Sequence, residues 1–181
     1  MDIESHLNDI TNYAQQWVHQ QILFYNQNSS PLGKSEAELL KHHFHTSTIS
    51  NTRLSFVESI ENPTFYSELQ KAGISNLINF NDTAGITFGN NIVISRKFEH
   101  TSGEFLSLLF HEMVHVVQYE ILGIEKFIFE YFNGWIKNGY SYYKIPLEEQ
   151  AYKLQARFDK KLPPFSVKDE VLNKFRGLFY K

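Results

Sequence analysis

The sequence predicts an α+β fold in which helices predominate and a small β-hairpin or sheet lies beside one of them. Two observations support this prediction. Apolar residues recur at helical spacing along much of the chain, and residues 85–95 combine two short β-rich runs with a turn rich in glycine and asparagine. With 181 residues, 42% of them hydrophobic, the chain can bury a sizeable core. We expect one domain over 1–181, with a mainly helical N-terminal lobe at 1–83, a core at 84–162, and a C-terminal tail or short helix at 163–181.

The N-terminal lobe is expected to consist of helices over 3–25 and 35–44, a strand over 53–60, and a short helix from Asn62-Pro63 to about Gly73. Ser35 and Glu38 have the spacing of a capping box, which predicts the start of the second helix. The same region contains a group of histidines that we expect on the surface, namely His42, His43 and His45.

The later part of the chain is expected to contain a hairpin over 85–95, helices over 101–122 and 124–137, a tyrosine-rich loop over 138–144, and a long helix from Pro146 to before Pro163. Thr101 and Glu104 form a second capping-box tetrad, and Gly123 follows the last apolar residue of the helix that this tetrad starts. The helix over 101–122 is therefore bounded at both ends.

The charge pattern excludes some classes of partner. Seventeen basic and twenty acidic residues give a formal net charge of -3, and no run of Lys or Arg could follow a phosphate backbone. We therefore expect no nucleic acid and no membrane as partner. No segment reads as a Sec signal peptide or a membrane-spanning helix, which leads us to expect a cytoplasmic location, with export by a non-Sec route left open.

The helix over 101–122 contains the pattern His111-Glu112-x-x-His115, which is typical of zinc hydrolases. Two histidines four residues apart lie on one helix face, so both imidazoles can reach one ion while Glu112 reaches its bound water. Ser107 and Gln118 fall on the same arc of the helix, which otherwise is strongly apolar. A polar stripe on such a helix indicates a cleft or a metal. The alternative is a pair of core histidines satisfied by hydrogen bonds, with Glu112 as partner.

A tetrahedral zinc ion with two histidines and a water needs a third protein ligand. Glu148 and Glu149, on the expected last helix, are the candidates. Glu148 lies about 90° from the centre of the apolar seam of that helix, whereas Glu149 lies almost opposite the seam. Glu148 is therefore the expected third ligand and Glu149 a solvated neighbour. The alternative is that both are ordinary first-turn acids that complement the helix dipole.

These residues carry a resemblance to a known family. The motif at 111–115, the Glu-x-x-Ala at 148–151 and the upstream hairpin resemble the gluzincin metallopeptidases, and residues 84–92 with 111–118 are similar to small bacterial metallopeptidase domains often encoded near contractile injection systems. The resemblance covers about 84–158. It implies a zincin-like catalytic core at 84–162, bound Zn²⁺, a peptide or protein substrate, and an association with such an injection system. It also implies that the strand with Ile92, Val93 and Ile94 forms a sheet edge that binds extended substrate.

The function that follows is a zinc metallopeptidase with Glu112 as general base. For the second oxyanion donor the resemblance favours Tyr140, and Tyr142, Tyr143 and His100 are the other candidates. One departure concerns Tyr152, which stands where thermolysin-like enzymes have an Asp that orients a ligand histidine. The alternative function is a zinc-binding structural or effector-associated module without general protease activity. A further alternative is another hydrolysis or self-processing.

Overall fold

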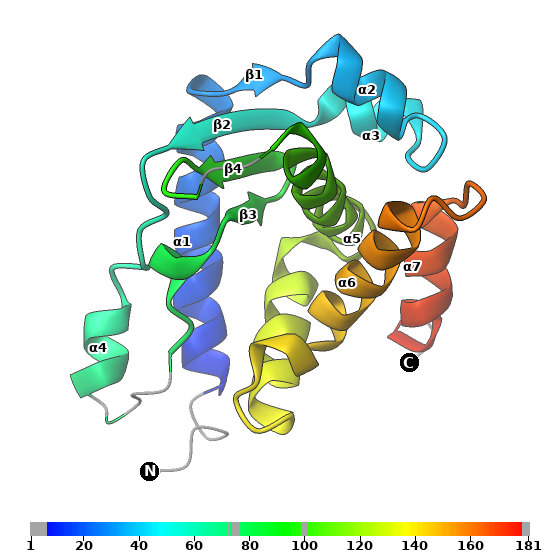
Figure 1. Cartoon of the computed structure of the whole chain (residues 1–181). Coiled ribbons are helices and arrows are strands. Elements are labelled where there is room, and N and C mark those ends of the chain that lie inside the picture. Colours follow the sequence, from blue (N-terminus) through cyan, green and yellow to red (C-terminus); the bar gives the residue numbers. More distant parts are fainter. Residues whose placement is uncertain (1–6, 72, 74–76, 99–100, 179–181) are drawn as a thin grey trace.

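The computed structural model describes residues 7–71, 73, 77–98 and 101–178 and has an α+β fold in which helices predominate (Figure 1). Its helices are α1 (Leu7–Gln27), α2 (Lys34–Leu40), α3 (Thr46–Asn51), α4 (Tyr66–Lys71), α5 (Ser102–Lys137), α6 (Pro146–Asp159) and α7 (Val167–Phe175). Its strands are β1 (Ser30–Pro31), β2 (Arg53–Val57), β3 (Gly85–Phe88) and β4 (Asn91–Ser95). The C-terminal part is thus a short helix, one of the two alternatives expected for it. Among the described residues, no helix has both the length and the hydropathy needed to cross a membrane.

The four strands form one sheet in the order β1-β2-β4-β3. The predicted hairpin is present, because β3 and β4 are antiparallel with Phe88 opposite Asn91. Its two-residue turn places Gly89 at a φ of 63°, a conformation that suits glycine. On its other side, β4 pairs in parallel with β2.

The predicted sheet edge is therefore wrong. Ile92, Val93 and Ile94 lie in a strand paired on both sides, and all three are buried. Strand β2, from the N-terminal lobe, occupies the side of β4 that the hairpin leaves open. The edge strand is β3.

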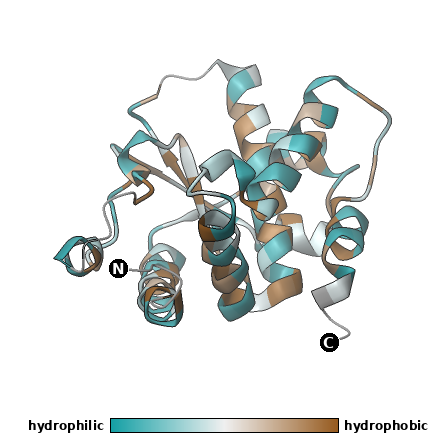
Figure 2. Cartoon of the chain, turned by 90° about the horizontal axis from the view of Figure 1, so that it is seen from below, coloured by the Kyte–Doolittle hydropathy of each residue, from teal (hydrophilic) through white to brown (hydrophobic). Residues whose placement is uncertain are grey.

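Helix α5 occupies the centre of the fold and contacts β3, β4, α1, α6 and α7 (Figure 1). It begins as predicted, with both hydrogen bonds of the Thr101–Glu104 capping box present. The predicted break is also present, because Gly123 has a φ of 74° and divides α5 into two helical parts. Each helix carries hydrophilic and hydrophobic residues, as expected for helices that bury one side (Figure 2).

The buried core is continuous between the two lobes. Ile10 and Val18 of α1 belong to the same cluster as Ile92 of β4 and Phe110 of α5, and Leu154 of α6 belongs to it too. The N-terminal lobe thus packs directly against the part of the chain that carries the His-Glu-x-x-His motif.

Two expectations for the N-terminal lobe are wrong. The second helix has Gly33 as its N-cap without a side-chain cap, and Ser35 lies inside the helix, where its hydroxyl bonds to Glu36. His43 is buried among phenylalanine rings rather than on the surface, because α7 and the preceding segment cover it. His42 and His45 are exposed as expected, and His45 caps α3.

Candidate metal centre

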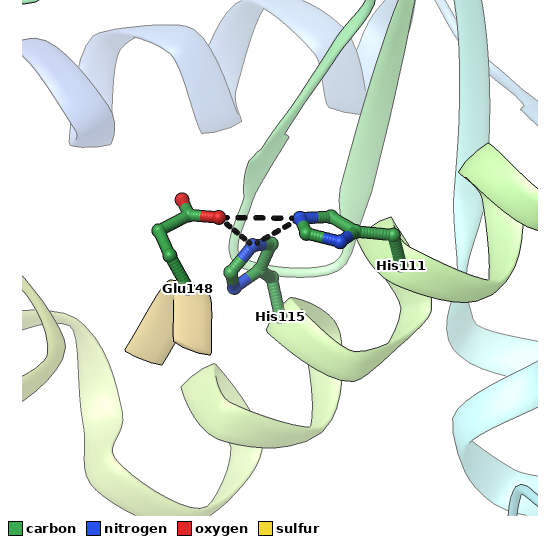
Figure 3. Close-up of side chains that lie close together, drawn as sticks. All are labelled: His111, His115 and Glu148. Carbon is green, nitrogen blue, oxygen red and sulfur yellow. Dashed lines mark hydrogen bonds and ion pairs between the residues drawn. The ribbon is translucent and has the colours of Figure 1, made fainter. Parts of the chain in front are cut away.

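Helices α5 and α6 bring together three side chains that can hold a metal ion, His111, His115 and Glu148 (Figure 3). Their exposed fractions are 4%, 5% and 2%, so the group is buried. Leu147 and Ala151 of α6 face the core, which turns Glu148 towards α5, whereas Glu149 is exposed. The predicted choice between the two glutamates is thus confirmed in position.

The spacing of the three ligand atoms fits a tetrahedral ion. His111 Nε2 lies 3.1 Å from His115 Nε2 and 3.2 Å from Glu148 Oε2, and His115 Nε2 lies 3.4 Å from the same oxygen. Bonds of the usual zinc–nitrogen and zinc–oxygen lengths, at tetrahedral angles, separate two ligand atoms by about 3.3–3.5 Å. The three atoms therefore outline one face of a coordination tetrahedron and leave its fourth corner to a further ligand.

The imidazole of His115 is held by a buried glutamine. Its Nδ1 lies 2.7 Å from Gln118 Oε1. The amide nitrogen of Gln118 donates to the carbonyl of Leu147 and to Gln150, so the oxygen of Gln118 must face the histidine. His115 then donates from Nδ1, which leaves the lone pair of Nε2 directed at the centre of the triangle.

The imidazole of His111 is held in the same way by a chain of groups that ends at the surface. Its Nδ1 lies 3.1 Å from Gln155 Oε1, Gln155 donates to Ser107 Oγ, and Ser107 donates to Asp159. Because a carboxylate only accepts, the direction of every hydrogen bond in this chain is set from Asp159 inwards. The place of the missing Asp is thus taken by Gln155, while Tyr152 packs against the ring of His111 at 4.5 Å between centroids.

Glu148 is also held on both oxygens. While Oε2 faces the histidines, Oε1 accepts a hydrogen bond of 2.9 Å from Tyr131, and Tyr142 is hydrogen-bonded to the same side chain. Burial raises the pKa of both phenols, and the nearby Glu148 carboxylate adds to this effect. They therefore stay protonated and can donate.

The charges of the triad favour a cation at its centre. Burial opposes ionisation of Glu148, but the two histidines outweigh burial and hold its pKa below the usual range. Burial lowers the pKa of His115, but the carboxylates of Glu148 and Glu112 outweigh it and raise that pKa to about 9. A positive charge is therefore stabilised here, whether carried by a proton or by a metal ion.

Glu112 lies beside the triad and is held against strand β3. Its Oε2 accepts a hydrogen bond of 2.7 Å from Thr87. A Cβ atom at position 85 would lie 2.7 Å from Glu112 Oε1, so the close approach requires Gly85. Burial raises the pKa of Glu112, more than His111, His115 and Thr87 lower it. A buried carboxylate with a raised pKa is suited to accept a proton near neutral pH.

Two cavities meet at this carboxylate. One is a cleft lined by His111, Tyr152, Gln155 and the tyrosine loop, and the other is an apolar cavity lined by His115 and Glu148. Glu112 lines both. The centre is therefore reached from two sides.

The structure places the tyrosine candidates differently. Tyr142 lines both cavities and contacts Glu148. Tyr140 and Tyr143 line the cleft, where Tyr140 packs its ring on Trp135. The remaining candidate, His100, lies outside the described residues.

Sequence reasoning missed several residues of the centre. Gln118 and Ser107 carried a signal, because they share the polar arc of α5 with the histidines. Gln155, Thr87 and Tyr131 carried none, because each reaches the centre through packing between elements.

Comparisons with protein-family models, with curated proteins and with solved structures find no match to this chain. Its centre must be interpreted from its own geometry.

Proposed function

We propose that this chain is a zinc-dependent metallopeptidase with a zincin-like core. The observation that carries the proposal is the buried triangle of His111, His115 and Glu148 beside a second buried carboxylate, Glu112. Two imidazoles, one carboxylate and an open fourth position form the ligand set typical of catalytic zinc. A structural zinc site has four protein ligands and needs no neighbouring base.

Bound zinc would supply a Lewis acid that polarises the scissile carbonyl and lowers the pKa of a water molecule. Glu112, oriented by Thr87 and Gly85, accepts the proton of the attacking water and passes it to the leaving amine. The phenol of Tyr142, which reaches both cavities, replaces Tyr140 as the proposed donor to the developing oxyanion.

The edge strand β3 is the proposed binding strand for an extended peptide, in place of β4. Gly85 lines both cavities, and Ile86 and Thr87 line the apolar one. A peptide paired with the outer side of β3 would pass Glu112 and the metal ligands.

The general base is tested by Glu112→Gln. Because a positioned base contributes about 10²–10⁴-fold to the rate, cleavage of a quenched fluorescent peptide library should fall by that factor while zinc content stays near one per chain. Zinc content is measured by elemental analysis of the same samples. Cleavage at the wild-type rate in this variant would exclude the mechanism, and a silent library with zinc bound to wild type would favour a non-catalytic zinc module.

The metal ligand is tested by a matched pair of neighbouring substitutions. Glu148→Gln should lower zinc affinity by more than about 100-fold, because it removes a ligand rather than an outer hydrogen bond. Glu149→Gln changes an exposed neighbour and should leave the affinity within about twofold. Chelator competition measures both, and equal affinities for the two variants would place the third ligand elsewhere. Iron rather than zinc in the purified protein would contradict the proposed metal.

A further inference from the structure

The apolar cavity beside the metal centre has a use that the catalytic groups do not explain. It opens at His115, Glu112 and Glu148. Away from them its walls are mainly aromatic and aliphatic, including Phe65, Phe80, Phe88, Phe127, Ile128 and Phe132. An apolar recess that adjoins a reactive centre is suited to bind an apolar group of the molecule that reacts there.

The N-terminal lobe supplies one wall of this cavity. Ala14, Trp17 and Val18, on three positions of α1, all line it. The ring of Trp17 is fixed by Phe88 at 5.0 Å and by Phe80 at 5.8 Å between centroids. These α1 residues lie before residue 84, outside the segment that resembles metallopeptidases, so the recess is closed by a part of this chain that the resemblance does not cover.

The cavity volume, about 60 Å³, decides what it can take. One water molecule needs about 10–15 Å³, so the cavity is several times too large for a single water. Its walls offer few polar partners far from the metal, so a chain of ordered waters is disfavoured there. A side chain of several carbon atoms fits both the size and the polarity.

We propose that this cavity is the specificity pocket of the centre, that it takes a large apolar or aromatic side chain next to the scissile bond, and that α1 sets its depth. This proposal rests on the proposed peptidase function for its substrate, but the pocket itself is testable without cleavage. Ala14 is the smallest of the three α1 residues that line it, and therefore limits the depth least.

The test compares two zinc-binding hydroxamates on the zinc-loaded full chain by calorimetry. Acetohydroxamate carries a methyl group, and 3-phenylpropionohydroxamate carries a phenyl group that can enter the pocket. Burial of the phenyl group should make the second compound bind about 10-fold to 100-fold more tightly than the first.

Three variants test the role of α1. Ala14→Leu fills the pocket and should abolish the preference for the phenyl compound. Val18→Ala widens the pocket and should retain the preference or increase it. Gln16→Leu adds the same side chain at an exposed position of α1 and should behave as wild type. Zinc content and the thermal unfolding midpoint, measured for each variant, show that the fold is intact.

The outcomes separate this inference from the proposed function. Equal affinity of wild type for the two hydroxamates, or the same loss of preference in Val18→Ala and Ala14→Leu, overturns the pocket. A preference that Ala14→Leu removes supports the pocket even when no peptide is cleaved. Cleavage of library peptides with no enrichment of apolar residues beside the cut bond would leave the peptidase standing and overturn the pocket.

Discussion

Helix α5 contacts buried histidines on two of its sides, and the two regions differ in how the rings are partnered. His111 and His115 are 4% and 5% exposed, and His43, which packs against Phe110 of α5, is 9% exposed. Burial therefore does not distinguish them. The hydrogen bonds do, because each ligand histidine has partners on both nitrogens, whereas His43 Nδ1 is buried without a partner among the described residues.

The comparison teaches how a buried histidine can be assigned. In the metal centre, both Nδ1 atoms are fixed by glutamines so that both Nε2 atoms converge on one point. The ring of His43 lies edge-on to Phe110, Phe158 and Phe165. Converging nitrogens indicate ligation, and edge-on contacts with aromatic rings indicate packing.

The largest expected effect is the loss of one converging nitrogen. His115→Phe should lower zinc affinity by more than about 100-fold, because it removes a metal ligand. His43→Phe makes the same change at the other buried histidine and should leave zinc affinity within about twofold. Both are measured by chelator competition. Similar losses in the two variants would erase the distinction between the regions.

A smaller effect is expected from the glutamines that orient the ligand histidines. Gln118 is fully buried, so Gln118→Leu should reduce zinc affinity by about 10–100-fold and the free energy of unfolding by about 1–3 kcal/mol. Gln155 is half-buried and its hydrogen-bond chain ends at the exposed Asp159, so water can replace part of it. We expect Gln155→Leu to reduce zinc affinity by about tenfold at most. A larger loss for Gln155 than for Gln118 would show that the surface chain is the more important support.

The smallest effect concerns pH and His43. Burial lowers the pKa of His43, and the nearby charges of His42 and Arg157 lower it further, although a hydrogen bond to the backbone of Phe165 opposes this. The unfolded chain therefore binds a proton at this residue more readily than the folded chain, and stability is lost as the pH falls through the usual histidine pKa near 6.5. Between about pH 7 and pH 5.5, His43→Phe should lose less stability than wild type in urea unfolding. Equal losses in both proteins would show that His43 does not couple folding to pH.

Much of the candidate site could be predicted because it depends on local geometry. The four-residue spacing of His111 and His115 places both rings on one helix face in any helical context. The position of Glu148 followed from the apolar seam of α6, which has one orientation relative to the core. The capping box at Thr101 formed because an apolar helix follows it directly, whereas the similar tetrad at Ser35 did not, because the helix there begins at Lys34.

The sequence by itself determined the helices, the hairpin with its glycine turn, the break at Gly123 and the pair of histidines on α5, because each depends on residues within one or two turns of chain. The tertiary structure decided which strand lies at the edge, that Gln155 supports His111, that Tyr142 rather than Tyr140 contacts Glu148, and that His43 is covered. These features join residues far apart in the chain, and their positions follow from how helices and strands pack, which local spacing does not specify.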